Sequence, residues 1–367
     1  VEISCKIGNG TASATGGKPV SGGNNIWHEG LSLGVKGGAE IGEAELATSK
    51  YITILDTLTE SNVAVIKPSK YEAGVKVLEK GASSSVTISQ CKSKFSLSDT
   101  TTGLVIYDNG TLAEEGFNPI YLEYGTEDDS SATGSIDSPA RSIKKAAELQ
   151  TADPGREIYI TKTYEYGVHS GEESYLSGLT TPVVLNRDAA LTGVMMKASG
   201  GTEGSPKVIS NVVLDGMKAT VAAAGYILEI AAGAYVKLGS GAVGQKNAAG
   251  GVNNKGTLII EGGAVKNNNG TLYGGGVYVQ NGTLTVKNGG EISGNEASHG
   301  SGIYVGSGAK VYIEDGGLVS GNSKSGSGEA VYIYTGAELT VIGGEIKDNG
   351  NIGISVEETG AKVTVSG

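Results

Sequence analysis

The stretch that decides the fold runs from Gly276 to Asn295 and reads GVYVQNGTLTVKNGGEISGN. It holds three short strings, GVYV, LTV and ISGN, in which apolar residues stand at alternate positions. The same strings return in the same order along the rest of the chain. Their closing residues form a column spaced by 27 positions, made up of Asn268, Asn295, Asn322 and Asn349.

Alternation with a period of two is typical of a half-buried strand rather than of a helix. Gly, Asn and Ser pairs separate the strings and mark turns. Three such strands cannot bury their apolar faces alone, but stacked coils can, with equivalent strands pairing in parallel about 4.8 Å apart. Leucine-rich repeats have similar periods, but their leucine consensus is absent here. We therefore expect an all-β fold, a right-handed parallel β-helix with three strands per coil of about 27 residues.

The rest of the chain suggests two parts. Residues 118–367 are expected to form the β-helix, with a capping helix at about 139–150 that begins at Ser138 as N-cap and Pro139 as first helical residue. Residues 1–117 read as a β-rich segment, a partial coil followed by a small mostly-β unit. In that unit Val86-Thr87-Ile88 is one of the expected strands.

Composition excludes several classes of protein. The 367 residues include 61 Gly and carry a formal charge of −11, so we expect no nucleic-acid partner. The sequence contains no apolar run of about 18 residues, so no membrane span is expected. The chain opens at Val1 without a signal peptide, which was either removed or omitted. Cys5 and Cys91 fit one disulfide or two inert thiols equally well.

Two resemblances follow from particular strings. The segment from Ile120 to Tyr166 resembles the opening of pectate-lyase-like β-helix proteins, with a Tyr-bearing strand, an acidic loop, Ser-Pro, a short helix and an Ile-Tyr-Ile strand. The Gly275-Gly276-Val277 string and the later Asn295 are similar to the repeats of polymorphic outer-membrane proteins and bacterial surface adhesins, with Ile292 where those repeats carry Phe. Residues 44–95 look like the closing segment of such units. These resemblances imply surface display and adhesion, so the chain is expected to be extracellular or at the cell surface.

Three sets of residues are candidates for structural or binding roles. The Asn column is expected to stack as an amide ladder inside the solenoid. Because the flanking valines face the core, the central tyrosines should point outward as an exposed row that could contact a glycan or a host protein. Cross-strand packing is the structural alternative for this row. The row consists of Tyr278, Tyr304 and Tyr332.

The third set concerns the last strand. Val363, Thr364 and Val365 end the sequence without a capping helix, Pro or charged edge. Open strand edges invite pairing with another chain. Self-association of this coil with the N-terminal segment of a second copy is therefore expected, and it would give head-to-tail filaments. A chain cut from a longer protein is the alternative explanation.

The residues for enzymatic or metal chemistry are sparse. Glu291 and Glu345 share a coil position and would lie about 9.6 Å apart, near the upper limit for an inverting glycosidase, but Leu318 stands between them. Arg187 beside Asp188 is a weak lyase-like pair. The acidic string Glu127-Asp128-Asp129 lacks calcium-loop spacing, and His28, His169 and His299 read as exposed loop residues. No catalytic residue, metal or cofactor is predicted.

The sequence thus favours a non-enzymatic bacterial surface or secreted protein that serves adhesion or structural assembly. The alternative is a carbohydrate-active β-helix enzyme, a polysaccharide lyase or glycoside hydrolase.

Overall fold

The computed structural model describes residues 2–3, 26–28, 33–126, 129–221, 225–323, 329–350, 352–356 and 359–367. Cys5 and the acidic pair Glu127-Asp128 lie outside the described residues. The chain divides into two compact units, Val1–Asn118 and Pro119–Gly367. The fold is all-β, with parallel sheets stacked as a β-solenoid of about 11 turns, which confirms the predicted fold class.

The N-terminal unit consists mainly of two parallel four-stranded sheets, in the orders β1-β3-β5-β7 and β2-β4-β6-β8. The small β unit that was expected to follow a partial coil is therefore not separate: its strands continue the same two sheets. An antiparallel pair, β9 and β10, follows the two sheets. The strands are β1 (Glu2–Ile3), β2 (Ile26–His28), β3 (Leu33–Gly37), β4 (Glu43–Leu46), β5 (Ile52–Leu58), β6 (Ala64–Lys67), β7 (Leu78–Lys80), β8 (Phe95–Leu97), β9 (Leu104–Ile106) and β10 (Leu112–Glu114).

The strand predicted at Val86-Thr87-Ile88 is wrong, because a short helix, α1 (Ile88–Cys91), starts there. The Thr87 hydroxyl accepts from the Gln90 backbone N–H at 3.3 Å, and the Gln90 side chain accepts from the Thr87 N–H at 2.9 Å. This reciprocal capping box satisfies two donors that a strand would have paired with a neighbour. Cys91 ends the helix as a free, buried thiol within the described chain, and burial raises its pKa to about 11.

The solenoid begins with β11 (Ile120–Leu122) and α2 (Ile143–Ala152). The predicted helix start at Ser138 and Pro139 is four residues too early, because Ala140 pairs with β11: its N–H donates to the Tyr121 carbonyl and its own carbonyl accepts from the Glu123 N–H, both at 2.9 Å. Ser142 is the N-cap instead, and its hydroxyl accepts from Lys145 N–H at 3.1 Å. The buried face of α2 packs on the first coil through Ile143, Ala146 and Ala147.

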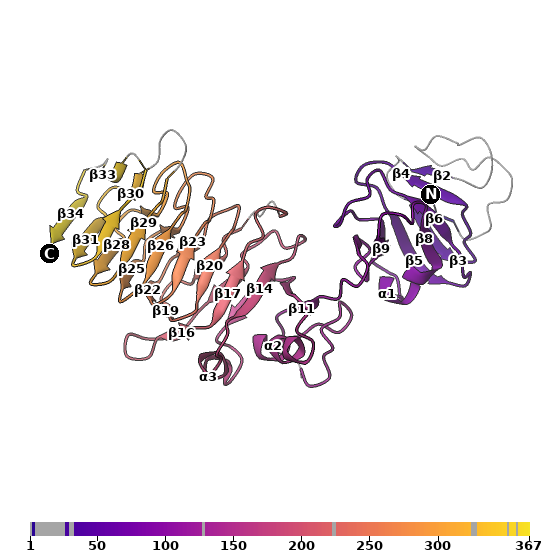
Figure 1. The fold of residues 1–367 in the computed structure, drawn as a ribbon, viewed down its shortest axis with the longest axis horizontal. Helices are drawn as coiled ribbons and strands as arrows, with labels where there is room; N and C mark the ends of the chain where they lie inside the picture. The colour runs from indigo at the N-terminus through magenta and orange to yellow at the C-terminus, as the bar shows by residue number, and fades with distance from the viewer. Residues whose placement is uncertain are drawn as a thin grey trace. The chain divides into compact units, whose positions relative to one another are not determined.

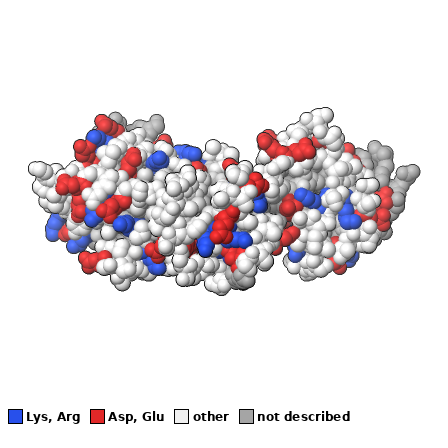
Figure 2. Space-filling view, turned by 60° about the horizontal axis from the view of Figure 1, so that its bottom comes forward, with Lys and Arg blue, Asp and Glu red and all other residues white. Residues whose placement is uncertain are grey.

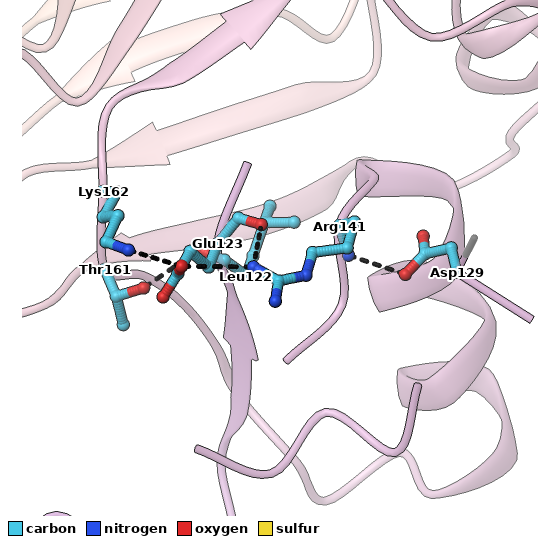
Figure 3. A network of polar contacts seen from close by, with 6 residues as sticks. All are labelled: Leu122, Glu123, Asp129, Arg141, Thr161 and Lys162. Atoms are coloured by element: carbon cyan, nitrogen blue, oxygen red, sulfur yellow. Dashed lines mark hydrogen bonds and ion pairs between the residues drawn. The ribbon is translucent and has the colours of Figure 1, made fainter. Parts of the chain in front are cut away.

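A polar network fixes the start of α2 (Figure 3). One carboxylate oxygen of Asp129 accepts from the Arg141 N–H at 2.7 Å, and the other accepts from the Ser142 N–H at 3.0 Å. The Arg141 guanidinium reaches Glu123 at 3.1 Å, and Lys162 reaches the same carboxylate at 2.5 Å. Both oxygens of Asp129 are therefore engaged in anchoring the acidic loop to the helix start.

Three parallel sheets form the solenoid, with one strand of each per regular coil (Figure 1). The nine-stranded sheet contains β11, β12 (Ile158–Ile160), β14 (Val183–Arg187), β17 (Val212–Asp215), β20 (Val243–Gln245), β23 (Ala264–Lys266), β26 (Glu291–Ser293), β29 (Leu318–Ser320) and β32 (Glu345–Lys347). The eight-stranded sheet contains β13 (Tyr164–Tyr166), β15 (Met196–Ala198), β18 (Leu228–Ile230), β21 (Val252–Asn254), β24 (Val277–Val279), β27 (Ile303–Val305), β30 (Glu329–Ile333) and β33 (Ile352–Val356). The seven-stranded sheet contains β16 (Lys207–Ile209), β19 (Tyr235–Leu238), β22 (Thr257–Glu261), β25 (Thr283–Lys287), β28 (Lys310–Glu314), β31 (Glu338–Ile342) and β34 (Lys362–Ser366). A short helix, α3 (Glu172–Ser177), lies between β13 and β14.

The core of the solenoid is a column of alternating strand residues, joined at one corner by the asparagines. Asn268, Asn295 and Asn322 are completely buried, and each side-chain amide donates to the Oδ1 of the next asparagine at 3.0–3.1 Å. Each Oδ1 also accepts a backbone N–H from the coil before it, and each amide donates to a second carbonyl. The ladder ends at Asn349 and extends one coil further back, to Asn247, whose backbone N–H donates to the Oδ1 of Asn268 at 3.1 Å.

Acidic and basic side chains are mixed on the surface of the solenoid (Figure 2). On the seven-stranded sheet, Glu338 lies between Lys310 and Lys362 at 3.5 and 3.4 Å. Such exposed pairs contribute little to stability, but alternating signs avoid the repulsion that like charges on stacked strands would cause.

Candidate functional site: an aromatic cluster on the eight-stranded sheet

The outward face of the eight-stranded sheet carries one uninterrupted row of tyrosines. Tyr278, Tyr304 and Tyr332 are direct partners in the parallel register of β24, β27 and β30. Val277 and Val279, on either side of Tyr278, are fully buried in the core. The ring centroids follow one another at 5.4 and 5.1 Å, close to the spacing of the strands. The tyrosines therefore point outward, as the alternation predicts.

The prediction that the whole row is exposed is wrong. Tyr304 is 7% exposed and Tyr332 is 5% exposed, and only Tyr278 is half-buried. Other rings cover the row: Tyr273 packs on Tyr304 at 4.5 Å, and His299 packs on Tyr332 at 5.2 Å. Removal from water also raises the pKa of Tyr278, with a smaller contribution from the nearby Tyr273.

The covering rings come from the segments that lead into β24 and β27. Gly274 and Gly300 directly follow Tyr273 and His299, and both have φ +59°. A Cβ on Gly274 would lie 2.7 Å from the Cα of Tyr278, and one on Gly300 would lie 2.3 Å from the carbonyl oxygen of Ile303. Only glycine permits both this backbone conformation and this approach. The two segments can therefore fold back over the strands and place a ring on the row.

A third ring, Tyr334, directly follows β30 and packs on Tyr304 at 6.3 Å. The sequence did not single out Tyr334 or Tyr273 as candidates, and His299 was interpreted only as an exposed loop residue. We call the resulting group the aromatic cluster. It consists of Tyr273, Tyr278, His299, Tyr304, Tyr332 and Tyr334.

Three members of the aromatic cluster are open to solvent. Tyr273 is 40% exposed, Tyr334 is 38% exposed, and the side chain of His299 is 41% exposed. Leu272, beside Tyr273, is 49% exposed. The buried pair Tyr304 and Tyr332 stacks with an interplanar angle of 13° and supports these side chains from below. The result is an apolar surface with polar edges, held on a rigid sheet.

One polar pair lies at the edge of the aromatic cluster. The Nδ1 of His299 is 3.8 Å from the Oε2 of Glu329. Both atoms are shielded from solvent, and neither has a hydrogen-bond partner in the described part of the chain. Because the imidazole as a whole is 41% exposed, its open part faces away from Glu329.

The residues considered for catalysis do not form a site. Glu291 and Glu345 both pair with Leu318, which separates them as predicted. The guanidinium of Arg187 is completely buried and donates to four backbone carbonyls, those of Leu191, Gly193, Gly225 and Tyr226, at 2.7–3.1 Å. Arg187 therefore closes a corner of two coils. Among the described residues, no group of three His, Cys, Asp or Glu side chains could hold a metal ion.

The last strand, β34, pairs with β31 and exposes its apolar residues. Val363 is 39% exposed and Val365 is 69% exposed, while Thr364 pairs with Thr340. Self-association through this strand stays a prediction. No described helix is long and apolar enough to cross a membrane.

The N-terminal unit contains a cavity of about 420 Å³. Its lining includes Lys50, Lys70, Lys76 and Tyr51. The ammonium group of Lys76 forms an ion pair with Glu79 at 2.6 Å and lies over the Tyr51 ring at 4.8 Å, so it already has partners within the chain. The aromatic cluster is therefore the stronger candidate.

The chain matches no family model, no curated protein and no solved structure.

Proposed function

We propose that this chain is a bacterial cell-surface or secreted β-solenoid that is not an enzyme and that acts in adhesion, with the aromatic cluster as its contact surface. The observation that carries the proposal is the exposure of Tyr273, His299 and Tyr334 above the buried stack of Tyr304 and Tyr332. The surface localisation is supported by the similarity of the Gly275-Gly276-Val277 and Asn295 strings to the repeats of bacterial surface proteins.

Such a surface has the properties of a binding site. Aromatic side chains bury large areas and lose few rotamers on binding, so they dominate many interfaces. The rings of the aromatic cluster are already held in place by ring contacts and by paired strands, so little further ordering is needed when a partner binds. Exposed apolar side chains that gather in one place commonly mark interaction sites.

An adhesion assay tests this proposal. Fluorescently labelled chain would be applied to a panel of cells, extracellular matrix proteins and surface glycans. The comparison includes a Tyr273→Ser/Tyr334→Ser double variant and a Tyr312→Ser control, whose half-buried ring points outward on the seven-stranded sheet. We expect binding by wild type and control and its loss in the double variant. Equal binding by all three proteins, or turnover of polysaccharides by the purified chain, would contradict the proposal.

A further inference from the structure

We infer that the aromatic cluster binds an uncharged saccharide whose rings stack on Tyr273 and Tyr334 and whose hydroxyl groups bond to the open edge of His299. This inference rests on the proposed function and specifies the ligand of the same site. It is carried by three features of the described residues: the path of the exposed rings, the charge around them and the orientation of the imidazole.

The exposed rings mark a diagonal path across three coils. Tyr273 precedes β24, whereas Tyr334 follows β30, and both pack on Tyr304 in β27, at 4.5 and 6.3 Å. The two exposed rings therefore lie toward opposite ends of the strands, with Tyr304 between them. Separate flat rings along a line suit a chain of saccharide rings, because each sugar presents an apolar face of C–H groups to one aromatic ring.

The charge near the aromatic cluster disfavours acidic ligands. Along the outward column of the eight-stranded sheet, five consecutive positions are uncharged: Asn253, Tyr278, Tyr304, Tyr332 and Ser355. Among the described residues, the segments that carry His299 and β30 bring two acidic side chains to this edge: Glu329, beside His299, and the exposed Glu296. A uronate, sulfate or sialate group would meet like charge there. An uncharged saccharide avoids this repulsion.

The imidazole supplies the polar contact that stacking lacks. With Nδ1 of His299 facing the Glu329 carboxylate at 3.8 Å, a proton on Nδ1 is favoured by the negative charge. In that tautomer Nε2, on the side of the ring away from Glu329, can accept from a saccharide hydroxyl. Tyr273 and Tyr334 carry hydroxyls that can donate or accept at the rim. A few oriented polar groups around stacked rings give specificity to an otherwise apolar site.

An oligosaccharide array with matched neutral and acidic members tests this inference on the full chain. The best neutral ligand would then be titrated calorimetrically against wild type, Tyr273→Ser, Tyr334→Ser, Tyr273→Phe and the Tyr312→Ser control. We expect each Ser variant to weaken binding about tenfold or more, as removal of a central aromatic contact commonly does. The Phe variant should lose less than the matching Ser variant, because it keeps the ring. Circular dichroism and thermal melting would verify that each variant is folded.

The outcomes separate this inference from the adhesion proposal. Binding of neutral saccharides that depends on Tyr273 and Tyr334 supports the inference. Binding of acidic saccharides only, or of none, overturns it, and so does neutral-saccharide binding that survives both Ser substitutions. If none binds while adhesion to cells still requires the two tyrosines, the saccharide class is wrong and the adhesion proposal stands. If saccharides bind at the cluster but adhesion does not need it, the adhesion proposal is wrong and the saccharide inference stands.

Discussion

Replacing Asn295 with Ala should destabilise the solenoid more than the same substitution at Asn349, in the last coil. The Asn295 side chain makes four hydrogen bonds: two donated, to Val265 O and Asn322 Oδ1, and two accepted, from the backbone N–H and the side-chain amide of Asn268, all at 3.0–3.1 Å. Ala at this completely buried position leaves two backbone groups, the Asn268 N–H and the Val265 carbonyl, without these hydrogen bonds. At about 1–3 kcal/mol for each unsatisfied buried group, the expected loss is about 4 kcal/mol.

Asn349→Ala is the matched control. Asn349 makes the same kind of contacts, accepting from Asn322 and donating to Val319 O at 3.0 Å, but it is half-buried. Water can replace part of its hydrogen bonding, so the expected loss is about 1 kcal/mol. The ladder thus predicts a gradient in stability from the interior coils to the last one.

Urea titration followed by circular dichroism would measure both losses, and hydrogen exchange would locate them. Because coils of a solenoid can unfold separately, the exchange rate of the Asn268 backbone N–H is the more specific readout. It should rise strongly in Asn295→Ala and change little in Asn349→Ala. Equal stability losses in the two variants, or an unchanged Asn268 amide, would refute the role of the ladder as the main polar support of the core.

Further predictions concern other parts of the chain. Burial raises the pKa of Glu172, which accepts from Tyr164 and from the first N–H of α2. Because folding favours its neutral form, the free energy of unfolding should fall as pH rises above 4.5 through the raised pKa. Urea titrations should therefore show the stability of Glu172→Gln increasing relative to that of wild type as pH increases. Gly274→Ala should cost about 1–3 kcal/mol more in thermal unfolding than Gly308→Ala, because both glycines have positive φ but only Gly274 would bring its Cβ against backbone; equal costs would remove the close approach as the reason for glycine. Sedimentation of the chain Val1–Gly367 should show concentration-dependent association that Val365→Lys suppresses, and a monomer at high concentration would exclude pairing through β34.

The regular features of the fold could be predicted from sequence because they repeat. The asparagines that recur every 27 residues are buried in the interior coils and hydrogen-bonded to their neighbours, so the same residue type returns at the same position. Alternation fixes which face of each strand is inward, and Val277, Tyr278 and Val279 obey it. Because stacking imposes the same pattern on every coil, the repeat can be recognised within a single amino-acid sequence.

Only the tyrosine row of the aromatic cluster could be predicted, because the rings that cover the row do not follow the alternation of the strands. Whether Tyr304 is exposed depends on the path of the segments before β24 and β27, which no alternation describes. A signal was present: an aromatic ring directly before a glycine, Tyr273-Gly274 and His299-Gly300, occurs at equivalent places in consecutive coils. The helix start was misplaced for a similar reason, since local rules favoured Ser138 while tertiary pairing of Ala140 with β11 decided the outcome.

We propose the aromatic cluster as the contact surface of the solenoid. Hydrogen–deuterium exchange of the chain, alone and bound to the target found in the adhesion assay, tests this most directly. We expect new protection in peptides that cover residues 269–280, 296–305 and 330–335, where the cluster and its strands lie. Protection confined to β34, to the N-terminal unit or to the seven-stranded sheet would contradict it.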